Sequence, residues 1–139
     1  MRHAPLILPA ALTLAACAAP AQPVAPEATT GTTVVNVTAL YRERIMLPPG
    51  HVLNVRVEDV SLADAPARVL AEANEPLAGG PPYRVTLAFS TAEIDPHTYA
   101  VRADIRDASG ALVFVTDTRH PVITQGAPTS AEIVLKSAR

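Results

Sequence analysis

Residues 83–89 read Tyr-Arg-Val-Thr-Leu-Ala-Phe, so that an apolar side chain occupies every second position. Successive side chains of a β-strand point to opposite faces, and this alternation therefore predicts a strand with one apolar face and one wet face. The same period of two recurs in residues 35–39, 53–58 and 99–106 and around residues 133–135, while residues 112–116 are apolar on both faces.

Residues with strong turn preferences separate these segments. Pro48-Pro49-Gly50 precedes the second alternating segment, Gly79-Gly80-Pro81-Pro82 precedes residues 83–89, and residues 107–110 predict a hairpin. Residues 63–75 read as a further strand, because Pro66 interrupts a helix there. The pattern predicts an all-β fold, a small antiparallel β-sandwich of about seven strands over residues 32–137.

The expected core is poor in aromatic side chains. The chain has no Trp, three Tyr and two Phe, so Val, Leu, Ile and Ala must supply most of the packing. Four aromatic residues lie on the apolar faces of their strands, and we expect them to fill the core. The alternative is that they line an apolar pocket between the sheets. These residues are Tyr83, Phe89, Tyr99 and Phe114.

The N-terminal part of the chain has a different character. A short basic start is followed by an apolar run that ends at Cys17, the one cysteine of the sequence. The run is shorter than the roughly 20 residues of a membrane-spanning helix and has the layout of a signal peptide over residues 1–16. Residues 17–31, rich in Pro and Ala, are expected to form a flexible tether.

Leu14-Ala15-Ala16-Cys17 resembles the lipobox of bacterial lipoproteins. The resemblance implies cleavage before Cys17, a diacylglycerol thioether on its sulfur and an acyl group on its new amino group. Several acyl chains together anchor a protein stably. The residue after Cys17 is Ala18 and not an aspartate. In lipoproteins of enteric bacteria this is associated with export to the outer membrane, so the resemblance implies an outer-membrane anchor with the domain in the periplasm.

Charge and motifs disfavour several functional classes. With a net charge of −2 the chain has no basic field for nucleic acid. The histidines beyond residue 16 lack metal-ligand spacing, and there is no nucleophile elbow or glycine-rich phosphate loop. Glu58 and Asp59 are neighbours and point to opposite faces of a strand, so they cannot act as a catalytic pair, and Asp59 is expected to cap the strand end. We therefore expect no catalytic residue, no metal site and no cofactor beyond the lipid on Cys17.

One charged stretch is a candidate for recognition. Tyr41, Arg42 and Arg44 directly precede the Pro48–Gly50 turn. Tyr and Arg are enriched at interface hot spots, and arginine forms strong contacts with carboxylates. We expect these three residues to form part of a partner-binding edge, unless the segment is only a well-defined turn of the sandwich.

Residues 41–61, together with residues 63–67, resemble the YbaY family of lipoproteins, which is grouped with the YscW-type pilotin chaperones of type III secretion. Residues 94–99, 116–118 and 121–124 fit the same pattern. The resemblance implies a small β-sandwich lipoprotein of the bacterial envelope. YscW-type members help an outer-membrane secretin to reach its membrane. No catalytic residue is carried over.

Two functional hypotheses follow. The first is a non-catalytic adaptor or pilotin-like chaperone that binds a secretin or another envelope protein, for example by accepting an extended segment at a sheet edge. The second is a binder of a small apolar or lipid ligand in a gap between the sheets.

Overall fold

The computed structural model describes residues 31–138, and it folds them into eight strands and one short 3₁₀ helix. The predicted signal peptide and most of the predicted tether, including Cys17, lie outside the described residues. The elements are β1 (Thr32–Tyr41), β2 (Val52–Asp59), β3 (Arg68–Pro76), β4 (Tyr83–Ser90), η1 (Thr91–Glu93), β5 (Tyr99–Arg106), β6 (Leu112–Val115), β7 (His120–Val122) and β8 (Ser130–Ser137).

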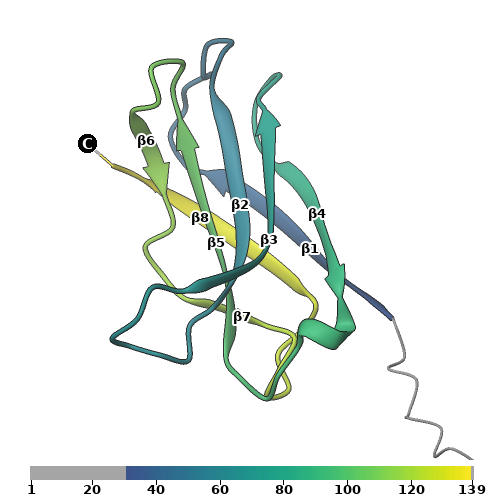
Figure 1. Ribbon diagram of the computed structural model, residues 1–139. Helices are drawn as coiled ribbons and strands as arrows, with labels where there is room; N and C mark the ends of the chain where they lie inside the picture. The colour runs from purple at the N-terminus through teal and green to yellow at the C-terminus, as the bar shows by residue number, and fades with distance from the viewer. Residues whose placement is uncertain (1–30, 139) are drawn as a thin grey trace, which may run out of the picture.

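The strands form two facing layers that are joined along one side. The strand order is β3-β2-β5-β6-β8-β1-β4, with β7 paired to β5. The link between the layers is short, since β6 pairs with β8 only through Phe114 with Ser137 and Val115 with Lys136. Figure 1 shows β1 and β8 crossing behind β2, β3 and β5. The all-β prediction is therefore confirmed, with the sheet curling into a near-barrel that leaves β3 and β4 as its edges.

Three details differ from the sequence-based expectation. β1 and β8 pair in parallel, so the sandwich is not purely antiparallel. β7 was not predicted, because three residues are too few to show alternation. β3 begins at Arg68 and not near residue 63, and residues 60–67 form a connecting loop before it. The other alternating segments form strands at the expected places.

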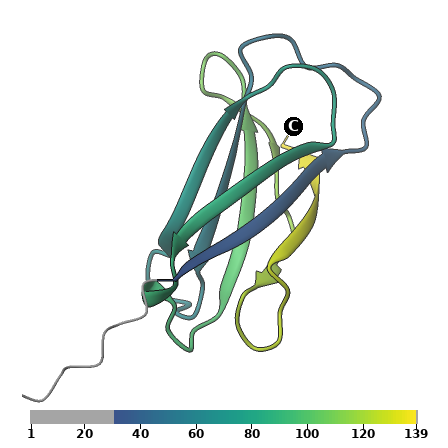
Figure 2. The same cartoon turned by 90° about the vertical axis from the view of Figure 1, so that its right-hand side faces the viewer.

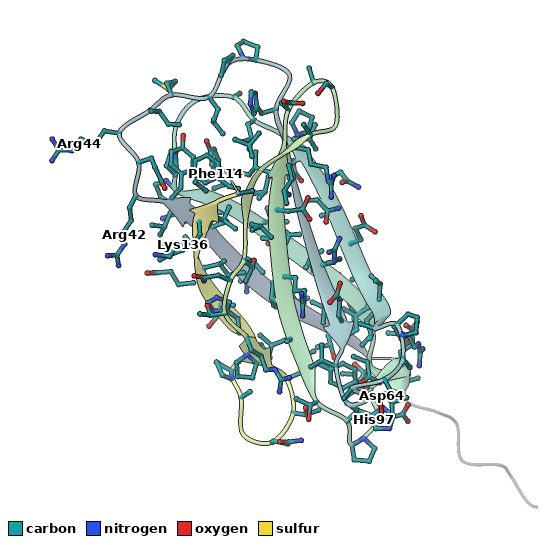
Figure 3. All side chains as sticks on the ribbon, turned by 90° about the vertical axis from the view of Figure 1, so that its left-hand side faces the viewer. Arg42, Arg44, Asp64, His97, Phe114 and Lys136 are labelled. Atoms are coloured by element: carbon teal, nitrogen blue, oxygen red, sulfur yellow. The ribbon has the colours of Figure 1, made fainter. Side chains whose placement is uncertain are left out.

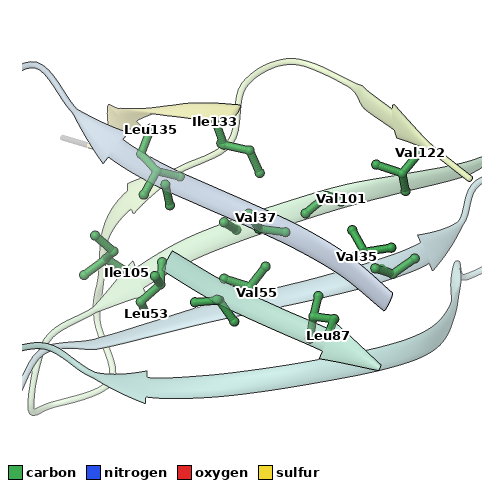
Figure 4. Close-up of a cluster of buried hydrophobic side chains, with 14 of the residues drawn as sticks. Val35, Val37, Leu53, Val55, Leu87, Val101, Ile105, Val122, Ile133 and Leu135 are labelled. Atoms are coloured by element: carbon green, nitrogen blue, oxygen red, sulfur yellow. The ribbon is translucent and has the colours of Figure 1, made fainter. Parts of the chain in front are cut away.

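The core lies between the two layers and consists mainly of aliphatic side chains, as the composition predicted (Figure 4). Val35, Leu53, Val55, Val101 and Ile133 are fully buried. Burial of each such side chain stabilises the fold by about 1.5–3 kcal/mol. No helix within residues 31–138 is long and apolar enough to cross a membrane.

The molecule has two distinct ends. β1 starts at the end where Thr91 N donates to Gly31 O at 2.8 Å, and we call this the Gly31 end. β1 finishes at the opposite end, where the loops 42–51 and 77–82 lie, and we call this the Met46 end (Figure 2). Figure 3 shows Arg42 and Arg44 at the Met46 end, with Asp64 and His97 at the other.

Candidate partner-binding surface

Tyr41 is the anchor of the Met46 end. Its side chain is only 4 % exposed, and its ring stacks on Phe114 with centroids 4.7 Å apart and an interplanar angle of 14°. The hydroxyl donates a hydrogen bond of 3.0 Å to the carbonyl oxygen of Ile45. The sequence predicts that Tyr41 lies on a partner-binding edge. Its position two residues after Ala39 puts it instead on the buried face of β1, so it positions the loop and offers no exposed ring.

Tyr83 holds the neighbouring loop in the same manner. Its ring lies 6.4 Å from that of Tyr41, and its hydroxyl donates to the carbonyl oxygen of Gly79 at 3.1 Å. Burial raises the pKa of Tyr83, and a hydrogen bond with Tyr41 adds to the effect. The phenol therefore stays protonated and remains a donor at neutral pH.

The loops 42–51 and 77–82 meet above these two tyrosines. A Cβ built on Gly80 would lie 3.8 Å from the Met46 sulfur, so the two loops lie close together at this point. Gly50 has φ +97°, a value that favours glycine, and it packs close to Ala108 of the 107–110 hairpin. The Nδ1 atom of His51 lies 2.9 Å from the Pro48 carbonyl oxygen and closes the turn.

Residues 42–46 are all exposed to solvent, and we call four of them the Met46 surface: Arg42, Arg44, Ile45 and Met46. The fifth is Glu43. Ile45 is 53 % exposed and Met46 is 73 % exposed, which is unusual for adjacent large apolar residues. Within residues 31–138 neither arginine forms an ion pair. Apolar area flanked by free guanidinium groups suits an apolar segment that carries carboxylates. The prediction that Arg42 and Arg44 contact a partner stays a prediction.

The four aromatic residues of the predicted pocket do not come together. Tyr83 and Phe114 lie at the Met46 end, whereas Phe89 and Tyr99 lie toward the Gly31 end. Among the cavities found in the described part of the chain, Tyr83 borders one of about 280 Å³ and Tyr99 another of about 310 Å³. Neither cavity is bordered by a second member of the four. Tyr99 and Phe114 are each 1 % exposed and fill the core.

A charged network covers the outer face of β2 and β5. Glu58 lies on that face as alternation requires, but it is only 7 % exposed because Arg56 and Arg102 both pair with it. Asp104 is 4 % exposed and pairs with Arg56 at 3.6 Å and Arg106 at 3.0 Å. Three arginines engage the two carboxylates of this network, so it offers no free carboxylate for acid–base chemistry.

A second polar cluster ties together the loops of the Gly31 end. Asp59 accepts hydrogen bonds from the backbone N–H and the hydroxyl of Ser61, as expected of a strand-end cap. Its other oxygen lies 2.7 Å from Nδ1 of His97. Because the Ser61 hydroxyl donates to Asp59 and not to the imidazole, the three groups do not form a nucleophile–base arrangement. Within the described residues no group of three His, Cys, Asp or Glu side chains could hold a metal ion.

The fold has a clear relative among solved structures. An alternative pilotin from the type II secretion system of Vibrio cholerae is similar to this chain, with a TM-score of 0.74 and 38 % sequence identity over 78 % of this chain and 99 % of that one. The domain is therefore a pilotin-type β-sandwich.

The sequence gives the family. The model of the type III secretion system lipoprotein chaperone family (YscW) matches residues 30–135, and the chain belongs to this family. The uncharacterized lipoprotein YbaY of Escherichia coli (strain K12) is 37 % identical over 92 % of this chain and 74 % of its own length. The resemblance inferred from residues 41–67 is thus confirmed, and the chain is a lipoprotein of the chaperone and pilotin type.

Proposed function

We propose that acylated Cys17 anchors this chain to the periplasmic face of the outer membrane, and that its domain acts as a non-catalytic, pilotin-type chaperone. The partner is a secretin or another envelope protein. The lipobox-like Leu14–Cys17 segment and the lipoprotein family support the anchor. The similarity to a pilotin supports the partner class.

The observation that carries the proposal is the position of the Met46 surface. Ile45 and Met46 are exposed at the end opposite to Gly31, where the chain enters β1. The chain therefore enters the domain at the end away from this surface. Buried Tyr41 restrains the backbone at Ile45, so less backbone conformational entropy is lost on binding.

The chemistry of the surface defines the segment that it binds. Covering Ile45 and Met46 with apolar side chains contributes up to about 1.5–3 kcal/mol for each residue. Arg42 and Arg44 then lie beside the contact and can donate to carboxylates of the partner. The bound segment is therefore apolar with acidic residues next to its apolar positions.

A crosslinked pull-down of the lipidated protein from outer-membrane fractions tests the proposal, with Cys17→Ser as the unanchored control. We expect capture of a secretin or another envelope protein by the lipidated form only. A form with Ile45→Ser and Met46→Ser should lose the partner. Leu62→Ser is the matched control, because Leu62 is 72 % exposed at the other end. Outer-membrane fractionation without any captured protein would contradict the chaperone function and favour the small-ligand alternative.

A further inference from the structure

The strand β8 continues well beyond its short pairing with β6. The last paired residues are Val115 and Lys136, and β6 ends at Val115. The chain then runs through residues 116–119 to β7, which pairs with β5. In the described part of the chain, β8 from Ser130 to Leu135 therefore has a strand partner on one side only, and this partner is β1.

A groove of about 400 Å³ lies between this part of β8 and the segment 117–120 that leads into β7, and we call it the β8 groove. Its volume falls within the range of roughly 300–1,000 Å³ that is usual for ligand pockets. Arg42 and Lys136 both line the groove, and Figure 3 shows both at the Met46 end. Because Arg42 also belongs to the Met46 surface, the β8 groove continues that surface along β8.

Backbone groups of β8 point toward this groove. Asn36 N donates to Thr129 O at 3.0 Å, so the odd-numbered residues of β8 are the ones that exchange hydrogen bonds with β1. The N–H and C=O groups of Glu132 and Val134 must then point away from β1. Both residues line the groove, and no strand within residues 31–138 pairs with them on this side.

The charged side chains are ordered along the groove. Lys136, Val134 and Glu132 share one face of β8 and follow one another at intervals of about 6.6 Å. Arg42 adds a positive charge beside Lys136, and Asp117, beyond the end of β6, adds a negative one. None of these four charged side chains forms an ion pair within residues 31–138. The groove is therefore positive at the Met46 end and negative farther along, with half-buried Val134 between.

We propose that the β8 groove binds an extended segment of a secretin partner in which an acidic, an apolar and a basic residue occupy alternate positions. This inference rests on the proposed chaperone function and specifies the sequence that the partner presents. The acidic residue lies beside Arg42 and Lys136, and the apolar residue covers Val134. The basic residue lies beside Glu132 and Asp117.

The spacing of the groove favours an extended segment over a helix. Lys136 and Glu132 are four residues apart on a strand, which separates their backbones by about 13 Å. An extended segment spans this distance with the same four residues, whereas a helix needs about nine residues. An extended backbone can also form main-chain hydrogen bonds with Glu132 and Val134. The order of charges then fixes the register of the segment in the groove.

Charge-reversal variants test the inference, with the lipidated full chain in detergent and the purified secretin of the host cell as probe. Lys136→Glu and Glu132→Lys should each weaken secretin binding at least tenfold. The two variants change the net charge in opposite directions, so a general attraction between unlike charges would strengthen binding in one of them. Stronger binding by either variant overturns the inference.

Arg119→Glu is the matched control, because Arg119 lies in the segment between β6 and β7 but its side chain borders cavities other than the β8 groove. It should bind secretin as the unmodified protein does. Circular dichroism establishes that all three variants are folded. Equal binding by folded Lys136→Glu and Arg119→Glu overturns the inference.

Site-directed crosslinking locates the segment independently. With the Cys17 thiol acylated, a thiol-reactive photo-crosslinker labels only the new cysteine of Met46→Cys, Val134→Cys or Leu62→Cys. The first two should capture neighbouring residues of the secretin, and Leu62→Cys should capture none. Mass spectrometry of the peptide captured at Val134→Cys should find an acidic and a basic residue four positions apart.

The outcomes separate the groove from the chaperone function. Secretin captured through Met46→Cys but not through Val134→Cys overturns the groove inference and leaves the chaperone function standing. A peptide captured at Val134→Cys without the two charged residues also overturns the inference. If the unmodified protein binds no secretin, the inference fails, whereas the chaperone function is contradicted separately by an empty pull-down.

Discussion

The ring of Tyr41 stacks on that of Phe114 at 4.7 Å, and through this contact a core residue fixes the shape of an exposed loop. The contact joins the end of β1 to β6, and the Tyr41 hydroxyl extends it to the carbonyl oxygen of Ile45. The exposed loop 42–51 of the Met46 end therefore depends on the buried contact between Tyr41 and Phe114.

Replacing Tyr41 separates these two roles. Tyr41→Phe keeps the stacking and loses the bond to Ile45, so it should lower the free energy of unfolding by about 1 kcal/mol. Tyr41→Ala removes the ring as well and should cost about 3–5 kcal/mol. Denaturant unfolding measures both values. Equal losses for the two variants would show that the ring contributes nothing beyond the hydroxyl.

Reversing the charge of Arg42 and Arg44, which form no ion pair within residues 31–138, should affect binding and not folding. Arg42→Glu with Arg44→Glu places carboxylates where the partner's carboxylates are expected, and should abolish partner capture. Because both side chains are exposed, the free energy of unfolding should change by no more than about 0.5 kcal/mol. Arg119→Glu, an exposed arginine of the β6–β7 connection, is the control. Undiminished capture by the folded double variant would remove these arginines from the binding surface.

Glu58 should be the most sensitive member of the charged network. Arg56 and Arg102 are register partners on β2 and β5, and Glu58 offsets their repulsion. Glu58→Gln should therefore destabilise the protein by about 1–3 kcal/mol, at the lower part of the usual range for a buried pair because the arginines reach solvent. Urea denaturation measures this, and added salt should recover part of the loss. Glu132→Gln, at an exposed position on β8, should have almost no effect.

Acid should destabilise the protein through Asp59. The hydrogen bond from the Ser61 hydroxyl, helped by the Ser61 N–H and by His97, lowers the pKa of Asp59 below its ordinary 3.8. A carboxyl group whose pKa is depressed in the folded state stabilises that state above the unfolded pKa and loses the contribution as pH falls through the folded pKa. Unfolding measured from pH 6 to pH 2.5 should show a steeper loss of stability for the unmodified protein than for Asp59→Asn. Parallel curves would show that Asp59 is not coupled to folding.

Alanine substitutions at Gly50 and Gly110 separate the cost of backbone strain from the cost of a steric clash with a neighbouring residue. Gly50 and Gly110 have φ values of +97° and +85°, but only at Gly50 would a new Cβ meet a neighbour, at 3.2 Å from Cβ of Ala108. Gly110→Ala should cost about 1–2 kcal/mol from backbone strain alone. Gly50→Ala should cost more, because the loop 42–51 must also move away from the 107–110 hairpin. Thermal unfolding compares the two, and identical losses would rule out the contact as a constraint.

Much of the fold could be predicted because strands leave a local signature. Alternation in residues 83–89 and 99–106 placed β4 and β5, and the prolines and glycines placed the turns between strands. Tyr41 could have been assigned to the core in the same way, since it continues the alternation of Val35, Val37 and Ala39. The charged residues that follow it concealed this signal.

The sequence by itself determined which face of each strand is buried, where most strands lie and, through residues 41–67, the family. Side-chain alternation and turn preferences are local properties, and local residues suffice to specify them. Tertiary structure alone decided that β1 and β8 run parallel, that Asp59 meets His97 and that β8 continues beyond its short pairing with β6. These features depend on which strands become neighbours and in what register, and the free energy of that choice is distributed over the whole core.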